Sequence, residues 1–130
     1  MDRSPIPEEL RRFVLTSVPS VPFLEALLLL RASPNQQWTA RSLADRLYLG
    51  ERTAQGLLDE LCRGAMAKPC PAPQAHAYCY APATALLRER IDDLADLYAR
   101  HLVDVTHLIH STLDRKAQQF ADAFRLRKDS

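Results

Sequence analysis

Cysteine and histidine side chains gather in one short part of this sequence and are the first candidates for chemistry. Cys70, His76 and Cys79 lie close together along the chain, and Cys62 precedes them. Such a set resembles the ligands of a structural zinc ion, but zinc sites usually draw cysteines in closely spaced pairs, and the sequence has no CxxC pair. We therefore predict no metal site and interpret the thiols as small side chains packed beneath a hairpin.

Cys62 has an alternative interpretation as a redox-sensitive thiol. Nearby positive charge lowers the pKa of a thiol and makes its thiolate reactive. Arg63 is the next residue along the chain and is the sequence feature that would act in this way. The redox alternative therefore depends on a lowered pKa at Cys62.

A second cluster of titratable residues lies nearer the C-terminus. Asp104, His107 and His110 recur every three residues, and His101 comes one turn earlier. Residues three apart share a helix face, so these side chains could bind a metal ion or form a pH-sensitive group. The interpretation we favour is that they are partly solvated or hydrogen-bonded to a neighbouring carboxylate.

Catalytic motifs are absent from the sequence. It contains no phosphate-binding P-loop, no GxGxxG, no GxSxG and no HExxH. No serine or cysteine stands in a recognisable nucleophile motif with a histidine and an acid. We therefore predict that the chain is not an enzyme and uses no cofactor.

The composition favours one compact, mainly helical domain. The 130 residues are 47% hydrophobic and 25% charged, with only three glycines and 7% aromatics. A net charge of +1 means that any basic surface must be local. The N-terminal residues carry no apolar signal segment, and no run is long enough to span a bilayer, so we expect a cytoplasmic protein with reduced thiols.

Hydrophobic periodicity predicts a series of short helices. One amphipathic helix is expected over 8–18 and a second, apolar nearly all round, over 21–31. Two further helices are tightly joined near Leu49 and Gly50. We expect Gly64 to end the second of these in the left-handed conformation that glycine favours.

Two short extended stretches follow, at 65–70 and 76–81, on either side of a proline-bearing loop at 71–75. They predict a β-hairpin. A hairpin turning at 71–75 pairs residues whose numbers sum to 146, so that Cys79 would face Ala67 rather than another thiol.

The segment from Leu43 to Leu47, the turn at Leu49 and Gly50, and the apolar spacing of Ala54 and Leu57 resemble winged helix-turn-helix regulators. This broad class includes the MarR, ArsR and PadR families, and the resemblance covers roughly residues 22–81. It implies a mainly α fold with a small β-hairpin, the wing. It also implies a DNA-binding transcription regulator.

The resemblance implies which residues would contact double-stranded DNA. The second helix of the motif would lie in the major groove, with Glu51, Arg52, Gln55 and Gly56 at its early positions. Arg52 could then bind guanine and Gln55 adenine. The residues expected to contact the DNA backbone are Arg41, Arg46, Arg63 and Lys68.

The local charge leaves an alternative open. Residues 36–80 contain five basic and four acidic side chains, and the predicted loop at 71–75 has neither lysine nor arginine. Glu51 suits the start of a helix but repels phosphate. The alternative function is a protein-interaction adaptor built on a degenerate winged helix, with a protein partner in place of DNA.

Residues 84–128 contain no proline or glycine, so a single helix of about 40 residues is allowed. Its apolar residues recur every eleven positions and form a nearly straight stripe. We expect this stripe to form a two-fold, coiled-coil-like homodimer, with an intramolecular helical hairpin as the alternative. The predicted interface residues are Ile91, Leu94, Tyr98, Leu102, Val105 and Ile109.

Three segments are thus expected. Residues 1–21 would pack on the C-terminal helix, residues 22–82 would form the winged helix-turn-helix, and residues 83–130 would form the long C-terminal helix.

Overall fold

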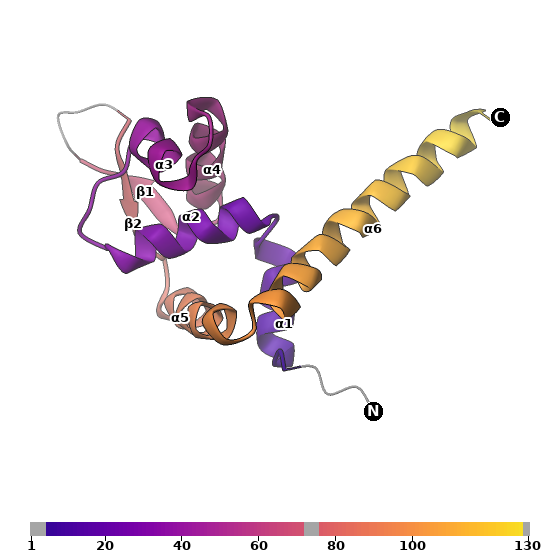
Figure 1. Cartoon of the computed structure of the whole chain (residues 1–130), viewed down its shortest axis with the longest axis horizontal. Helices are drawn as coiled ribbons and strands as arrows, with labels where there is room; N and C mark the ends of the chain where they lie inside the picture. The colour runs from indigo at the N-terminus through magenta and orange to yellow at the C-terminus, as the bar shows by residue number, and fades with distance from the viewer. Residues whose placement is uncertain (1–4, 72–75, 129–130) are drawn as a thin grey trace.

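The computed structural model describes the backbone of residues 5–71 and 76–128, and their side chains apart from 112–116 and 124–128 (Figure 1). The elements, in chain order, are α1 (Glu8–Ser17), α2 (Val21–Ala32), α3 (Ala40–Leu47), α4 (Glu51–Arg63), β1 (Ala67–Pro69), β2 (Tyr78–Tyr80), α5 (Ala85–Arg100) and α6 (Leu102–Lys128). The predicted class, mainly α with a small β-hairpin, is confirmed.

Helix α2 forms the centre of the molecule. It lies between α3 and α4 on one side and α5 on the other (Figure 1). Phe23, Leu24, Leu27 and Leu30 are buried, as expected for a helix that is apolar nearly all round. Pro22 stands in its first turn, where no backbone N–H is needed, and the Ser20 hydroxyl caps it by accepting from the Phe23 N–H.

No single described helix is long and apolar enough to cross a membrane. Helices α1 and α2 together have the required length and composition, but they are bent by 107° relative to each other.

The pair α3 and α4 forms the predicted helix-turn-helix. A capping box begins α3, in which the Thr39 and Ser42 side chains each accept from the other residue's backbone N–H, at 3.1 and 2.9 Å respectively. Tyr48 ends the helix in the left-handed region, with φ of 56°. Gly50 is the N-cap of α4. These local signals bring the start of α4 close behind the end of α3.

The end of α4 differs from the prediction. Gly64 has φ of −81° and is not left-handed, whereas Ala65 has φ of 61°. A side chain at Gly64 would stand 3.4 Å from the Met66 Cε and 3.5 Å from the Glu60 carbonyl oxygen. These are ordinary van der Waals distances, so the space around Gly64 would accept a side chain, and the left-handed residue that follows α4 is Ala65.

The hairpin forms, but its register is shifted by one residue. Ala67 pairs with Tyr80, Lys68 with Cys79 and Pro69 with Tyr78, so paired numbers sum to 147 rather than 146. The loop itself, at 72–75, lies outside the described residues. A tertiary contact holds this register, since the backbones of Trp38 and Tyr78 exchange two hydrogen bonds of 2.7 Å.

The expected long C-terminal helix is broken. Helix α5 ends at Arg100, His101 has φ of −135°, and α6 begins at Leu102. The break lets both helices pack against α1, which contacts each of them. Beyond that contact α6 projects away from the rest of the molecule (Figure 1). The sequence has no proline or glycine here, so the single-helix prediction is wrong because packing on α1 decides the break.

Candidate nucleic-acid interface

The exposed face of α4 is held in place by its buried face. Ala54, Leu57, Leu58 and Leu61 point into the core, where α4 packs on α2, α3 and β1. Four buried apolar side chains at helical spacing fix the rotation of a helix about its own axis. The opposite face of α4 therefore has a defined orientation toward solvent.

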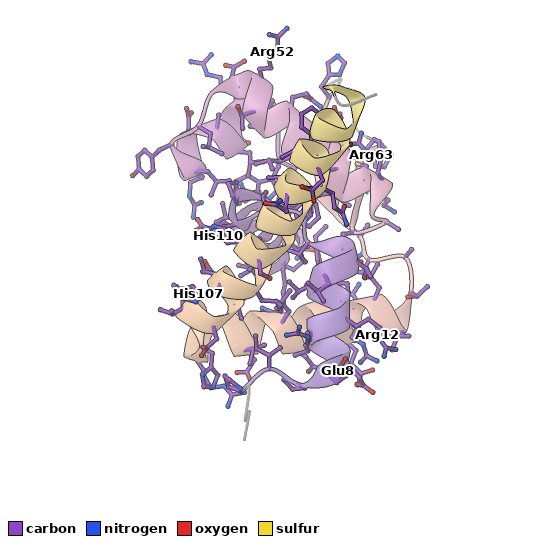
Figure 2. The ribbon with its side chains drawn as sticks, turned by 90° about the vertical axis from the view of Figure 1, so that its right-hand side faces the viewer. Glu8, Arg12, Arg52, Arg63, His107 and His110 are labelled. Carbon is purple, nitrogen blue, oxygen red and sulfur yellow. The ribbon has the colours of Figure 1, made fainter. Side chains whose placement is uncertain are left out.

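Arg52 is the most prominent charge on that face. Figure 2 shows it at one end of the molecule, pointing away from the body. Its side chain is exposed, and no hydrogen bond or ion pair joins it to the described part of the chain. A guanidinium that is unpaired keeps all five of its N–H donors available for an external acceptor. The predicted base-contacting residue thus lies where a ligand can reach it.

Gln55 has a different environment from the one the sequence suggested. Its Nε2 donates to the Asp59 Oδ1 and to the Tyr78 Oη, each at 3.0 Å. Bidentate binding of adenine needs the same amide N–H group together with the amide oxygen. Gln55 in this structure instead ties α4 to β2, and reading a base would require it to give up one of these bonds.

The predicted backbone-contacting residues lie in three places. Arg41 and Arg46 are exposed on α3, and the Arg46 guanidinium lies 5.8 Å from the centroid of the Trp38 ring, within cation–π range. Lys68 is exposed on β1. Arg63 is exposed at the far end of α4, about 16 Å along the helix axis from Arg52. Figure 2 shows Arg52 and Arg63 well apart.

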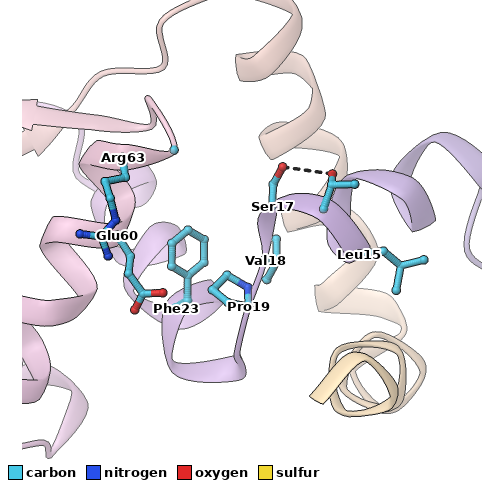
Figure 3. A pocket seen from close by; sticks show the side chains of 9 residues that line it. Leu15, Ser17, Val18, Pro19, Phe23, Glu60 and Arg63 are labelled. Carbon is cyan, nitrogen blue, oxygen red and sulfur yellow. Dashed lines mark hydrogen bonds between the residues drawn. The ribbon is translucent and has the colours of Figure 1, made fainter. Parts of the chain in front are cut away.

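Arg63 borders a hollow of about 300 Å³ between α4 and the connection from α1 to α2 (Figure 3). Phe23, Glu60 and Arg63 lie on one side, and Ser17 and Leu15 on the other. The Ser17 hydroxyl already lies 3.3 Å from that of Thr16. The hollow therefore lies at the end of α4 opposite to Arg52.

The three cysteines are half-buried free thiols, and two of them meet on the hairpin. The observed register puts Cys79 opposite Lys68, on the same face as Cys70. Burial, and then a hydrogen bond with Cys79, raise the pKa of Cys70 to about 11. As expected, Cys79 pairs with a residue other than a thiol, but that residue is Lys68 rather than Ala67, and the shifted register brings Cys79 onto the face of Cys70.

Burial also raises the pKa of Cys62, with Asp59 and Cys79 adding to the rise. A raised pKa keeps a thiol protonated at neutral pH, which makes it a poor nucleophile. The redox alternative required the opposite shift, so the structure removes its basis. Among the described residues, no group of three histidine, cysteine or acidic side chains could hold a metal ion.

The histidines of the C-terminal region lie along the start of α6. The His101 Nδ1 is 3.7 Å from the Asp104 Oδ2. His107 and His110 are exposed and project from α6 on one side of it (Figure 2). These positions agree with the favoured interpretation of solvated or carboxylate-paired side chains, and a role as ligands or pH sensors stays the alternative.

Four of the six predicted dimer residues are buried within the single chain. Ile91, Leu94, Val105 and Ile109 each have 0% exposure. The break at His101 folds α5 and α6 onto the rest of the molecule and covers these side chains. They belong to the chain's own core, which corrects the expectation of a continuous uncovered stripe. Tyr98 is half-buried, and Leu102 is 53% exposed.

Tyr48 is a surface feature that the sequence reasoning missed. It is 95% exposed and holds a left-handed backbone between α3 and α4. The sequence feature that indicates it is the position of Tyr48 two residues before Gly50. That turn is so tight that at least one of its residues must leave the right-handed region.

Comparison with solved structures identifies the fold. Heme-free PefR is similar, with a TM-score of 0.51 and 15% sequence identity over 89% of each chain. This chain has a winged-helix fold. At such low identity the likeness concerns the winged-helix architecture alone.

Two other solved structures are less similar. RV1404 from Mycobacterium tuberculosis has a TM-score of 0.49 and 14% identity. The match covers 84% of this chain but only 65% of the length of RV1404. The adhesin competence repressor AdcR from Streptococcus pyogenes has a TM-score of 0.45 and 15% identity, covering 90% of this chain and 93% of that one. No protein-family model matches the sequence of this winged-helix chain, and no curated protein matches it significantly.

Proposed function

We propose that this winged-helix chain is a dimeric regulator that binds double-stranded DNA in a sequence-specific manner, with the N-terminal half of α4 in the major groove. The observation that carries the proposal is Arg52, an exposed and unpaired guanidinium at the outer end of a helix whose rotation the core fixes. Bidentate arginine contacts to guanine are the commonest specific contacts in the major groove.

Charges on neighbouring elements support this placement. Arg41 and Arg46 are exposed on α3, the helix that crosses the DNA backbone in a helix-turn-helix complex. The backbone N–H groups at the start of α4 also favour phosphate. Glu51 opposes phosphate at that end, so the affinity depends on the arginines more than on the helix terminus.

Dimerisation is the second part of the proposal. Helix α6 projects away from the body, and Leu102 and Val103 at its start are 53% and 62% exposed. Leu86 on α5 is 58% exposed. Exposed apolar side chains on a projecting helix favour a second copy of the chain as their cover. A two-fold dimer would present two α4 helices to half-sites one or more DNA turns apart.

The test measures DNA binding by fluorescence anisotropy at about 50 and 200 mM salt, because phosphate contacts weaken as salt rises. We expect Arg52→Ala to flatten the preference for a selected operator over mixed sequence. Arg41→Ala should weaken binding to all sequences and reduce the salt dependence.

Arg12→Ala is the matched control, because Arg12 has the same charge but lies at the opposite end of the molecule (Figure 2). It should leave affinity unchanged. Equal loss on all sequences with Arg52→Ala would refute the base-reading role. Absence of binding by a folded wild-type protein at low salt would refute DNA binding.

The adaptor is the second candidate function, and the acidic side chains of α4 favour it. Asp59 is exposed and Glu60 half-buried, and both lie on the outer part of the same helix as Arg52. An adaptor would still bind its protein partner with Arg52→Ala. It would lose that binding when Leu102 is replaced by a charged residue.

A further inference from the structure

Gly56 lies in the middle of α4, where a glycine has no internal explanation. It is the sixth of the 13 residues of the helix. A Cβ added there would meet nothing within 4 Å, so the space around it is open. Glycine in a helix interior destabilises the helix relative to alanine. Nothing described within the chain requires the missing side chain.

The position of Gly56 indicates what could require it. Residues four apart share a helix face, so Gly56 lies directly next to Arg52 on the face opposite the buried Ala54 and Leu58. An α-helix with side chains is about 10–12 Å across, and the major groove is about 12 Å wide. A helix that carries no side chain at the centre of its outer face can therefore enter the groove more deeply.

We propose that Gly56 is the point where DNA approaches the backbone of α4 most closely, and that its missing side chain lets Arg52 reach the base edges. This inference rests on the proposed DNA binding and adds the contact geometry to it. Gln55 supports the same geometry, because its bonds to Asp59 and Tyr78 hold its side chain toward β2 and away from the space above Gly56.

The experiment compares Gly56→Ala and Gly56→Leu with the wild-type protein, measuring both Tm and affinity for a selected DNA duplex. We expect the alanine variant to melt about 2–5 °C higher, because the helix is more stable. Its DNA affinity should nevertheless fall about tenfold, and that of the leucine variant about 100-fold, because larger side chains overfill a close contact.

Thr16→Ala is the control. The substitution leaves the charge unchanged and places alanine at an exposed helical position. Thr16 lies on α1, away from the proposed DNA-binding helix. This substitution should leave DNA affinity unchanged. A second control is the Gly56→Ala protein on mixed-sequence duplex, where a helix that is not seated in the groove should lose much less affinity.

The outcomes separate the inference from the function on which it rests. Wild-type affinity in Gly56→Ala and Gly56→Leu would overturn the inference and leave DNA binding intact. A lower Tm in Gly56→Ala would also overturn it, because the glycine would then have an internal role. Failure of the wild-type protein to bind any duplex would overturn both.

Discussion

At the scale of single residues, two positions hold a residue type that the local backbone conformation does not favour. Tyr48 has a left-handed backbone, which glycine adopts without steric cost. Gly56 lies inside a continuous helix that alanine would stabilise. Both lie on or beside the outer surface of the helix-turn-helix. Local costs of this kind are expected where binding, rather than stability, decides the residue.

Replacing Tyr48 by glycine should stabilise the protein. The left-handed region costs a side-chain-bearing residue about 1 kcal/mol, and a side chain that is 95% exposed has little packing to lose. Added freedom of the unfolded chain offsets part of the gain, so we expect about 0.5 kcal/mol in urea denaturation. Tyr48→Ala keeps the strain and is the matched control. A loss of stability with glycine would show that the tyrosine packs in solution.

The raised pKa of Cys70 predicts slow alkylation at neutral pH. The thiolate reacts, and a pKa of about 11 keeps the thiol protonated until strongly alkaline pH. The rate of iodoacetamide labelling, followed by peptide mass spectrometry, should rise with pH toward that value. Cys79→Ala removes the hydrogen bond, so labelling should then rise at lower pH. A rate at Cys70 that levels off near pH 9 would contradict the prediction.

At the scale of elements, the helices follow local sequence signals and their relative placement does not. The capping box of Thr39 and Ser42 and the proline in the first turn of α2 are readable in the sequence. The hairpin register, by contrast, depends on two backbone bonds between Trp38 and Tyr78. A one-residue shift moves side chains to the other face of the hairpin, but strands of three residues carry too short a hydrophobic pattern to choose between the two registers.

The link between α4 and β2 should be measurable as a coupling energy. The bond from the Gln55 Nε2 to the Tyr78 Oη is part-buried, and such bonds contribute about 0.5–1.5 kcal/mol. Tyr78→Phe and Gln55→Ala should each destabilise the protein, and the double variant should lose less than their sum. Asp59→Ala removes the other, exposed bond of Gln55 and should cost less. Strict additivity of the Tyr78 and Gln55 variants would contradict the link.

At the scale of the whole molecule, the break at His101 decides which apolar residues are buried and which stay exposed. A single straight helix would have exposed one stripe, but α5 and α6 both pack on α1 and bury Ile91, Leu94 and Ile109. The exposed apolar residues at the start of α6 remain outside. Folding of the single chain and the proposed association of two chains therefore depend on different residues.

Substitutions can separate these two roles. Ile109→Ala removes a fully buried side chain and should destabilise the chain by about 2–5 kcal/mol in denaturant unfolding. Leu102→Glu, at a half-exposed position, should leave the subunit folded and shift the protein from dimer to monomer in analytical ultracentrifugation. A folded Leu102→Glu dimer as tight as the wild type would place the interface elsewhere.

The sequence by itself determined helices α1 to α4, the turn between α3 and α4, the presence of the hairpin and the exposure of Arg52, because each depends on residues a few positions apart. Only the tertiary structure decided the hairpin register, the break at His101 and the environment of Gln55. Each of these depends on contacts between segments distant in the chain: Trp38 with Tyr78, α1 with α5 and α6, and α4 with β2. Local periodicity carries no information about which distant surface a side chain will meet.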